Sequence, residues 1–130
     1  MEQGKLIVQG KDIAFNRIKL EDKKTGMLIL SHTGKQDNFK QRDSGLNHVL
    51  CNLARDNDIV FGIDFLEILE VQGKERGEVL ARIMQNIKLM KKSGNKVKMI
   101  NKSGRENLDL RAFLTSLGMR NDDAKDAVEN

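Results

Sequence analysis

Residues 42–50 read Arg-Asp-Ser-Gly-Leu-Asn-His-Val-Leu, and the rest of the chain can be organised around this stretch. Ser44 stands where a helix N-cap is expected, because its hydroxyl can accept hydrogen bonds from the amides of a first helical turn. Apolar residues follow at helical spacing and predict one buried stripe, made of Leu46, Val49, Leu50, Leu53 and Ala54. His48, Cys51 and Arg55 project from the opposite side, so we expect His48 to face solvent or a partner.

Strand and helix patterns alternate on both sides of this stretch. Short apolar runs predict strands at residues 5–9, 27–30, 59–65 and 96–101, and periodic apolar residues predict further helices at 13–22, 74–92 and 108–117. The run at 27–30 is apolar without alternation, which is typical of a strand covered on both faces. The alternation predicts an α/β fold with an open parallel sheet of about four strands.

The predicted helix at 74–92 is the longest, and its C-terminal end is well marked. Lys91 and Lys92 complement the negative end of the helix dipole, and Gly94 suits a left-handed cap. We expect Arg82 and Gln85 to lie away from the apolar face of this helix. We expect one domain over residues 1–120, followed by an acidic C-terminal tail at 121–130 that could form a frayed helix.

The bulk composition indicates a soluble protein of the cytoplasm. A chain of 130 residues is enough for one core, and a net charge of +4 is moderate for a nucleic-acid binder. The single cysteine excludes a disulfide framework within the chain, as expected in a reducing compartment. We see no signal peptide and no stretch long enough to cross a membrane.

Two kinds of catalytic site can be weighed against the residues. His32, Asp64 and Asp109 follow or end predicted strands, where α/β folds place ligands, but two histidines are few for a multinuclear metal centre. His48 and Cys51 could form a thiolate–imidazolium pair, although a cysteine beside an apolar stripe is more often a packing residue. The glycines are isolated and form no phosphate-binding loop.

Seven cations follow one another without an intervening acid, at Lys88, Lys91, Lys92, Lys96, Lys98, Lys102 and Arg105. The run spans a helix end, a strand and a loop, so we expect its charges to return towards one side of the fold. Closely spaced cations suit a phosphate backbone, whereas the plainer interpretation is a solvated face. The charges therefore favour contact with RNA.

The motif at 42–50 also resembles the signature of the ribonuclease P protein component 3 family, the archaeal counterpart of the thirty-kilodalton subunit of eukaryotic ribonuclease P. Further segments agree with this family in the same order, namely Asn16-Arg17 with Glu21, residues 28–32, residues 63–65 with Leu69, and residues 109–111. The resemblance implies a TIM-like barrel, which needs about eight strands and about 250 residues. This chain offers four strands and is shortened at its N-terminus relative to the family, so we expect a partial TIM-like barrel with helices on one face of an open sheet.

The resemblance also implies a function. In the family the protein is a non-catalytic subunit, and the RNA component cuts precursor tRNA at its 5′ side using Mg²⁺ while the protein, paired with a second small protein subunit, supports it. The protein itself would bind no metal and no cofactor, would contact precursor tRNA only indirectly, and would not meet a membrane. Alternative functions are a small metal-dependent phosphoesterase of related barrel ancestry and a scaffold that binds only proteins.

The candidate RNA-binding residues combine the basic run with positions matched to the family, and they are Arg17, Lys40, Arg42, His48, Lys88, Lys92, Lys98, Lys102 and Arg105. Lys40 stands as an alternative to Arg42 because the loop length leaves their alignment open. The motif residues with a structural or functional role are Ser44, Gly45, Asn47 and Asp109. Unpaired edge amides of an incomplete sheet also lead us to expect a homodimer or a complex with the second subunit.

Overall fold

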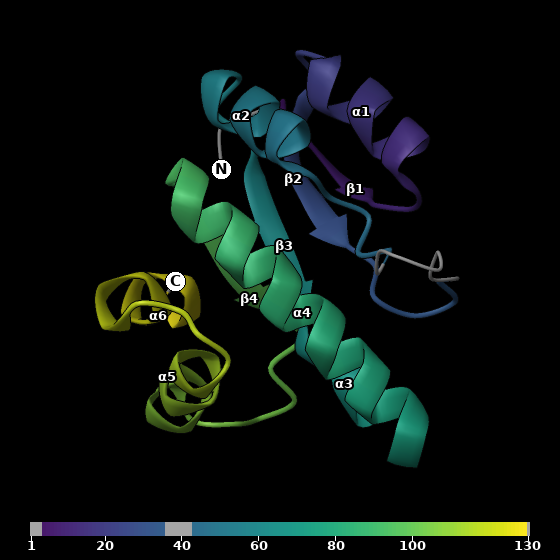
Figure 1. Ribbon diagram of the computed structural model, residues 1–130. Coiled ribbons are helices and arrows are strands. Elements are labelled where there is room, and N and C mark those ends of the chain that lie inside the picture. Colours follow the sequence, from purple (N-terminus) through teal and green to yellow (C-terminus); the bar gives the residue numbers. More distant parts are fainter. Residues whose placement is uncertain (1–3, 36–42, 130) are drawn as a thin grey trace.

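The computed structural model describes residues 4–35 and 43–129 of the chain. Within these residues the strands are β1 (Leu6–Gln9), β2 (Thr25–Leu30), β3 (Val60–Asp64) and β4 (Val97–Ile100). The helices are α1 (Ile13–Glu21), α2 (His48–Asp56), α3 (Phe65–Leu69), α4 (Gly73–Ser93), α5 (Asn107–Ser116) and α6 (Asn121–Val128) (Figure 1). Lys40 and Arg42 lie outside the described residues.

The strands form one parallel sheet in the order β1-β2-β3-β4. In Figure 1, α1, α2 and α4 lie in front of this sheet, while α5 and α6 lie beside β4. The predicted α/β fold with an open parallel sheet is confirmed for the described part of the chain.

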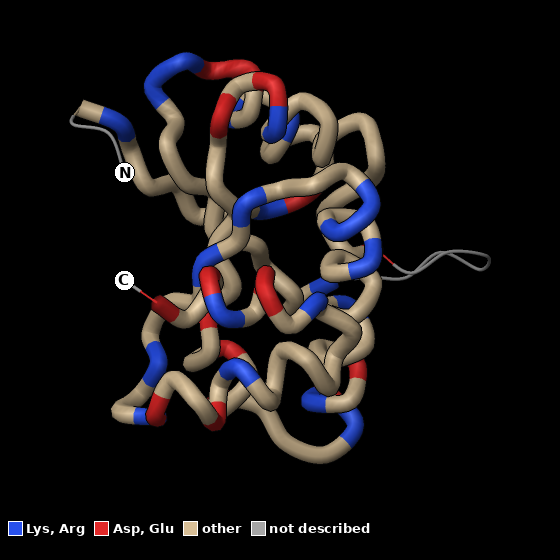
Figure 2. Tube along the Cα trace, turned by 90° about the vertical axis from the view of Figure 1, so that its left-hand side faces the viewer, with Lys and Arg blue, Asp and Glu red and all other residues tan. Residues whose placement is uncertain are grey.

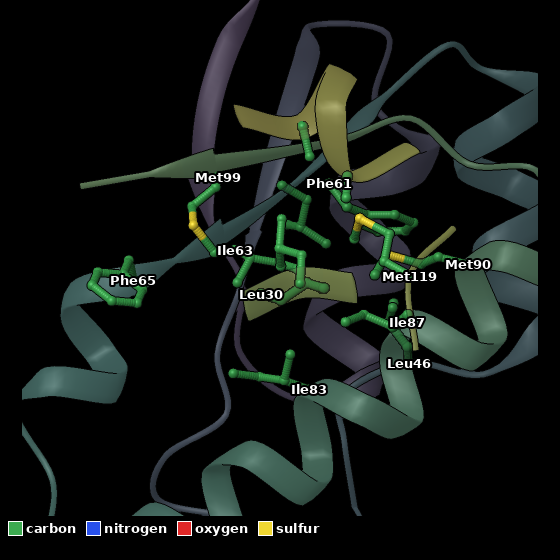
Figure 3. Packing of buried hydrophobic residues seen from close by; sticks show 14 of the residues in the cluster. Leu30, Leu46, Phe61, Ile63, Phe65, Ile83, Ile87, Met90, Met99 and Met119 are labelled. Atoms are coloured by element: carbon green, nitrogen blue, oxygen red, sulfur yellow. The ribbon is translucent and has the colours of Figure 1, made fainter. Parts of the chain in front are cut away.

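One face of the sheet carries the core. In-register residues of neighbouring parallel strands point to the same side, and Leu28 and Leu30 of β2 pair with Phe61 and Ile63 of β3. All four are fully buried or nearly so, together with Met99 of β4. Figure 3 shows Leu30, Phe61 and Ile63 grouped with the α4 side chains of the same hydrophobic cluster. Burial of this apolar face against the helices is therefore the main stabilising contact of the fold.

The residues between these positions point to the other face, and they are less well covered. Ile7 is 57% exposed, and Met27, Ile29 and Val60 are only partly buried. Gly62 lies among them, and a Cβ atom there would come 3.2 Å from the Met27 sulfur and 3.3 Å from Ile29 Cγ1. The strand at β2 is thus buried tightly on one side only, and the expectation of full cover on both faces is wrong.

Helix α2 begins later than the sequence pattern predicted. Asn47, and not Ser44, is its N-cap, since Asn47 Oδ1 accepts the Leu50 amide hydrogen bond at 2.9 Å. The later start changes which residues face the core: Cys51 is fully buried, whereas Val49 is 43% exposed. His48 is exposed, as predicted. The prediction that Val49 is buried and that Cys51 lies on the opposite side was wrong. It counted Leu46 as part of the helix, although Leu46 precedes α2.

The segment after β3 turns into a short helix that the sequence analysis missed. Asp64 ends β3 and caps α3, because its Oδ1 accepts from the Leu66 amide at 3.0 Å. The apolar run was assigned wholly to a strand, and its last residue, Phe65, is the first residue of α3. This helix brings Glu67 to the carboxyl end of β2, where it becomes part of the site described below.

The acidic segment at 121–128 is helix α6, whose Ala124, Ala127 and Val128 are buried. Its C-terminal carbonyl groups accept hydrogen bonds from two lysines of the basic run. Lys98 Nζ donates to the Asp126 carbonyl at 2.6 Å and to the Glu129 carbonyl at 3.2 Å, and Lys102 Nζ donates to the Val128 carbonyl. Cations at the negative end of a helix dipole stabilise it, so these two lysines hold α6 beside β4.

Candidate nucleic-acid interface

Residues 43–47, which we call the signature loop, are mostly folded into the protein. Ser44, Gly45 and Leu46 are buried, and the Gly45 amide donates to Asp43 Oδ1 at 3.1 Å. Gly45 has a φ of +79°, in the left-handed region that favours glycine. The loop is therefore a buried connection that positions Asn47 and His48 at the start of α2.

Asn16 of α1 fastens this loop to the end of β1. Its Nδ2 donates to the Gly45 carbonyl at 2.9 Å, and its Oδ1 accepts from the Lys11 amide at 2.8 Å. A Cβ atom on Gly45 would come 3.3 Å from both the Lys11 carbonyl oxygen and Lys35 Nζ. The left-handed backbone conformation therefore favours glycine at position 45, and a Cβ atom there would also crowd the Lys11 carbonyl.

Asn86 of α4 holds the loop from the other side. Its Nδ2 donates to the Ser44 carbonyl and also lies against His32 Nε2, both at 3.0 Å. Because the carbonyl can only accept, the amide nitrogen must face both groups, so His32 Nε2 is an acceptor and carries no proton. The His32 proton is then on Nδ1, which lies 2.8 Å from Glu67 Oε1.

Glu67 completes this buried hydrogen-bond network. Its Oε2 accepts from the His32 amide at 2.9 Å and from the Thr33 hydroxyl at 3.1 Å. Burial alone would raise the pKa of the Glu67 carboxyl, but hydrogen bonds from the His32 ring, the His32 amide and the Thr33 hydroxyl outweigh it and lower the pKa below its ordinary value. The hydrogen-bond network formed by Glu67, His32, Asn86 and Ser44 therefore joins α3, the end of β2, α4 and the signature loop.

Arg82, one turn before Asn86 on α4, is 4% exposed, so the expectation that it lies away from the buried face is wrong. Its Nε donates to the Asp43 carbonyl at 2.9 Å and its Nη2 to the Lys35 carbonyl at 3.4 Å. The guanidinium also lies 4.0 Å from Glu78. Arg82 is buried because these backbone acceptors replace the water that it loses, and it ties both described ends of the 35–43 segment to α4.

The candidate RNA-binding cations occupy different parts of the surface. Arg17 is exposed and pairs with Glu21 at 3.6 Å, and His48 is exposed at the start of α2. Lys88 and Lys92 lie near the C-terminal end of α4, before β4, whereas Arg105 follows the carboxyl end of β4. The basic run is thus split between the two ends of β4, contrary to the expectation of one side. Figure 2 likewise shows basic segments spread over the surface with acidic segments between them.

The two catalytic alternatives find no support in the geometry. Among the described residues, no three His, Cys, Asp or Glu side chains converge on a point that could hold a metal ion. Burial raises the pKa of the Cys51 thiol to about 12, so the thiol stays protonated near neutral pH and cannot act as a nucleophile. Cys51 is a core residue.

None of the helices in the described part of the chain is long and apolar enough to cross a membrane.

Comparison with known proteins identifies several relatives of this chain. No protein-family model matches the chain. Ribonuclease P protein component 3 of Methanococcus maripaludis (strain C6) and that of Methanocaldococcus jannaschii are each 29% identical over 119 residues, covering 86% of this chain and 48% of the relative. The protein of the same name from Methanosarcina mazei is 29% identical over 128 residues, covering 95% of this chain and 51% of the relative.

A solved structure agrees with these relatives. One chain of the cryo-EM structure of archaeal ribonuclease P with mature tRNA matches with a TM-score of 0.76 and 26% identity, covering 94% of this chain and 52% of that one. The resemblance to ribonuclease P protein component 3 predicted from the sequence is therefore confirmed. The chain spans about half the length of the relatives it matches.

The lowered pKa of Glu67 predicts how stability depends on pH. A carboxyl whose folded-state pKa lies below its unfolded value stabilises the fold above the unfolded pKa, and this contribution is lost as the pH falls through the folded-state pKa. We expect the free energy of unfolding, measured by denaturant titration from about pH 7 to about pH 3, to fall less steeply on the acid side in Glu67→Gln than in the unaltered protein. The exposed Glu70→Gln should keep the original dependence, and equal acid-side slopes for all three proteins would contradict the assignment.

Proposed function

We propose that this relative of ribonuclease P protein component 3 is a non-catalytic, RNA-binding subunit of ribonuclease P. In this function it supports the RNA-catalysed removal of the 5′ leader from precursor tRNA. The observation that carries the proposal is the structural match over 94% of the chain to a chain of archaeal ribonuclease P. The sequence identity of 29% to proteins of that name supports it independently of the fold.

The chemistry of the chain fits a supporting function better than a cutting one. The buried donor groups of Asn16, Arg82 and Asn86 bond to backbone carbonyls, so they position the signature loop. In this proposal the Mg²⁺ ions belong to the RNA, and the protein supplies cations that reduce the repulsion between phosphates. We place the protein in the cytoplasm, where a free buried thiol such as that of Cys51 is stable.

The contact surface that we propose uses the exposed cations. Arg17, His48, Lys88, Lys92 and Arg105 are exposed in the described structure. Lys98 and Lys102 already donate to the end of α6, so their contribution to RNA binding would be weaker or would require those bonds to be exchanged. Lys40 and Arg42 are retained from the sequence resemblance.

The protein partners that we propose are the second small ribonuclease P protein subunit or a second copy of this chain. The support is the partly exposed apolar face of a parallel sheet and the exposed edge of β1, where Leu6 and Ile7 are more than half exposed. Parallel sheets are normally covered on both faces. Precursor tRNA would be met indirectly, through the RNA.

This apolar face predicts self-association of the isolated chain. Light scattering should give a mass above that of one chain, and the mass should rise with protein concentration, because burial of apolar sheet surface favours association. Replacing the exposed Ile7 by Lys should shift the mass towards that of one chain, whereas Ile18→Lys on α1 is the matched control. A mass of one chain at every concentration would contradict the homodimer and leave the second subunit as the partner.

The RNA contact itself is tested by the salt dependence of binding. Each phosphate contact releases counterions, so the double variant Lys88→Ala/Lys92→Ala should lower the log–log slope of affinity for ribonuclease P RNA against salt by about 0.7–0.9 for each lost contact. The matched control is Lys23→Ala/Lys24→Ala, which removes the same charge from an exposed turn outside the proposed surface.

Three outcomes decide the proposal. A lower slope in the first double variant and an unchanged slope in the second support it, and the first variant should also raise the Mg²⁺ concentration that the reconstituted enzyme needs. Equal salt slopes in all three proteins would show that Lys88 and Lys92 are not part of the RNA-contact surface. Absence of any salt-dependent RNA binding by the unaltered chain would overturn the function.

A further inference from the structure

A pocket of about 290 Å³ lies between α3, α4 and α5, away from the signature loop. Its apolar wall is formed by Phe65, Ile68, Leu80, Leu110 and Phe113. The rings of Phe65 and Phe113 meet edge to face, with centroids 5.6 Å apart. The volume lies just below the range of about 300–1,000 Å³ that is usual for small-ligand sites, so the pocket suits one flat ring system and not a large ligand.

Two charged side chains of opposite sign line the same pocket, and both are exposed. The Arg105 guanidinium carbon lies 5.7 Å from the centre of the Phe65 ring. Within the described part of the chain, neither a hydrogen bond nor an ion pair engages the Asp109 carboxylate, although Asp109, in the first turn of α5, is only four residues from Arg105 in the sequence. An arginine and an aspartate that do not neutralise each other beside an aromatic wall are both available to a ligand.

A third charge lines the pocket at its α4 side. Arg76 Nε donates to the Val71 carbonyl at 2.8 Å and to the Ile68 carbonyl at 3.2 Å, so its guanidinium is held in place by backbone groups. The pocket therefore combines an apolar wall, a fixed cation, a second cation that can stack on a ring, and one carboxylate acceptor.

We propose that this pocket receives one unpaired nucleobase of a single-stranded RNA segment. The inference rests on the proposed function, since it assumes that RNA reaches this end of the fold. Unstacked bases bind by stacking on aromatic rings or on arginine planes, and they are selected by hydrogen bonds to their edges. The phosphates on either side of the base would meet the charges of Arg105 and Arg76.

The Asp109 carboxylate predicts which base the pocket prefers. A carboxylate has two oxygens that only accept, and guanine presents two adjacent donors, N1–H and the N2 amino group, on its Watson–Crick edge. Uracil presents one donor between two acceptors, which would face the Asp109 oxygens unfavourably. The pocket should therefore prefer guanine over uracil.

The test uses the full chain and two oligoribonucleotides, UUGUU and UUUUU, at low salt. We expect UUGUU to bind at least about fivefold more tightly, the factor expected when one good paired contact to a base edge is gained. The methyl NMR signals of Ile68 and Leu80 should shift with UUGUU. Guanosine 5′-monophosphate alone should shift the same signals but bind more weakly than UUGUU, since it lacks the neighbouring phosphates; equal affinity would indicate a free nucleotide as the natural ligand and would overturn the RNA assignment.

Two variants make the result specific to Asp109. Asp109→Asn replaces one acceptor by a donor and should reduce the ratio of the two affinities towards one, whereas Asp122→Asn, an exposed aspartate in the first turn of α6, should leave the ratio unchanged. Equal affinities of the unaltered protein for both oligonucleotides, no binding of either, or pocket methyl signals that stay in place while UUGUU binds would overturn the inference. In the last case the pocket would be free for an apolar side chain of a protein neighbour, while salt-dependent binding of ribonuclease P RNA would still support the proposed function.

Discussion

The Asn86 amide group is the contact on which the arrangement of the site depends. It donates to His32 Nε2 at the end of β2 and to the Ser44 carbonyl in the signature loop, and both acceptors are buried. In a low-dielectric interior an unpaired polar group costs more than a paired one gains, so the two acceptors fix the position of α4 relative to β2 and the loop. Glu67 extends the same constraint to α3, and Asn16 extends it to α1.

This constraint explains why the signature residues are largely buried although the proposed function is binding. Ser44 and Gly45 hold the start of α2 against α1 and α4, which presents His48 to solvent at a fixed place. The cations then divide into exposed groups and groups with structural partners, since Lys98 and Lys102 secure α6. A polar motif identified in the sequence can thus fix the position of neighbouring exposed residues while being buried itself.

Much of the fold follows from the sequence, because apolar runs and helical periodicity indicate the alternating strands and helices, and this alternation predicts an open parallel sheet. The end of α4 was predicted correctly, with Gly94 left-handed at a φ of 72°. The buried polar residues were missed, although positions 79, 82, 83, 86, 87 and 90 make one helical stripe. Arg82 and Asn86 occupy this stripe and therefore require buried partners, but those partners are backbone carbonyls and a histidine distant in sequence. Such pairings depend on three-dimensional packing that local patterns do not encode.

The most direct test of this account is the replacement Asn86→Ala, followed by denaturant unfolding and by hydrogen exchange of the Gly45 amide. We expect the free energy of unfolding to fall by about 1–3 kcal/mol for each buried acceptor left unpaired. The amide hydrogens of the signature loop should also exchange faster. The exposed Lys88→Ala on the same helix should change neither quantity. If the free energy of unfolding of Asn86→Ala stays within about 0.5 kcal/mol of that of the unaltered protein, and the Gly45 amide remains protected from exchange, the central role of the hydrogen-bond network would be contradicted.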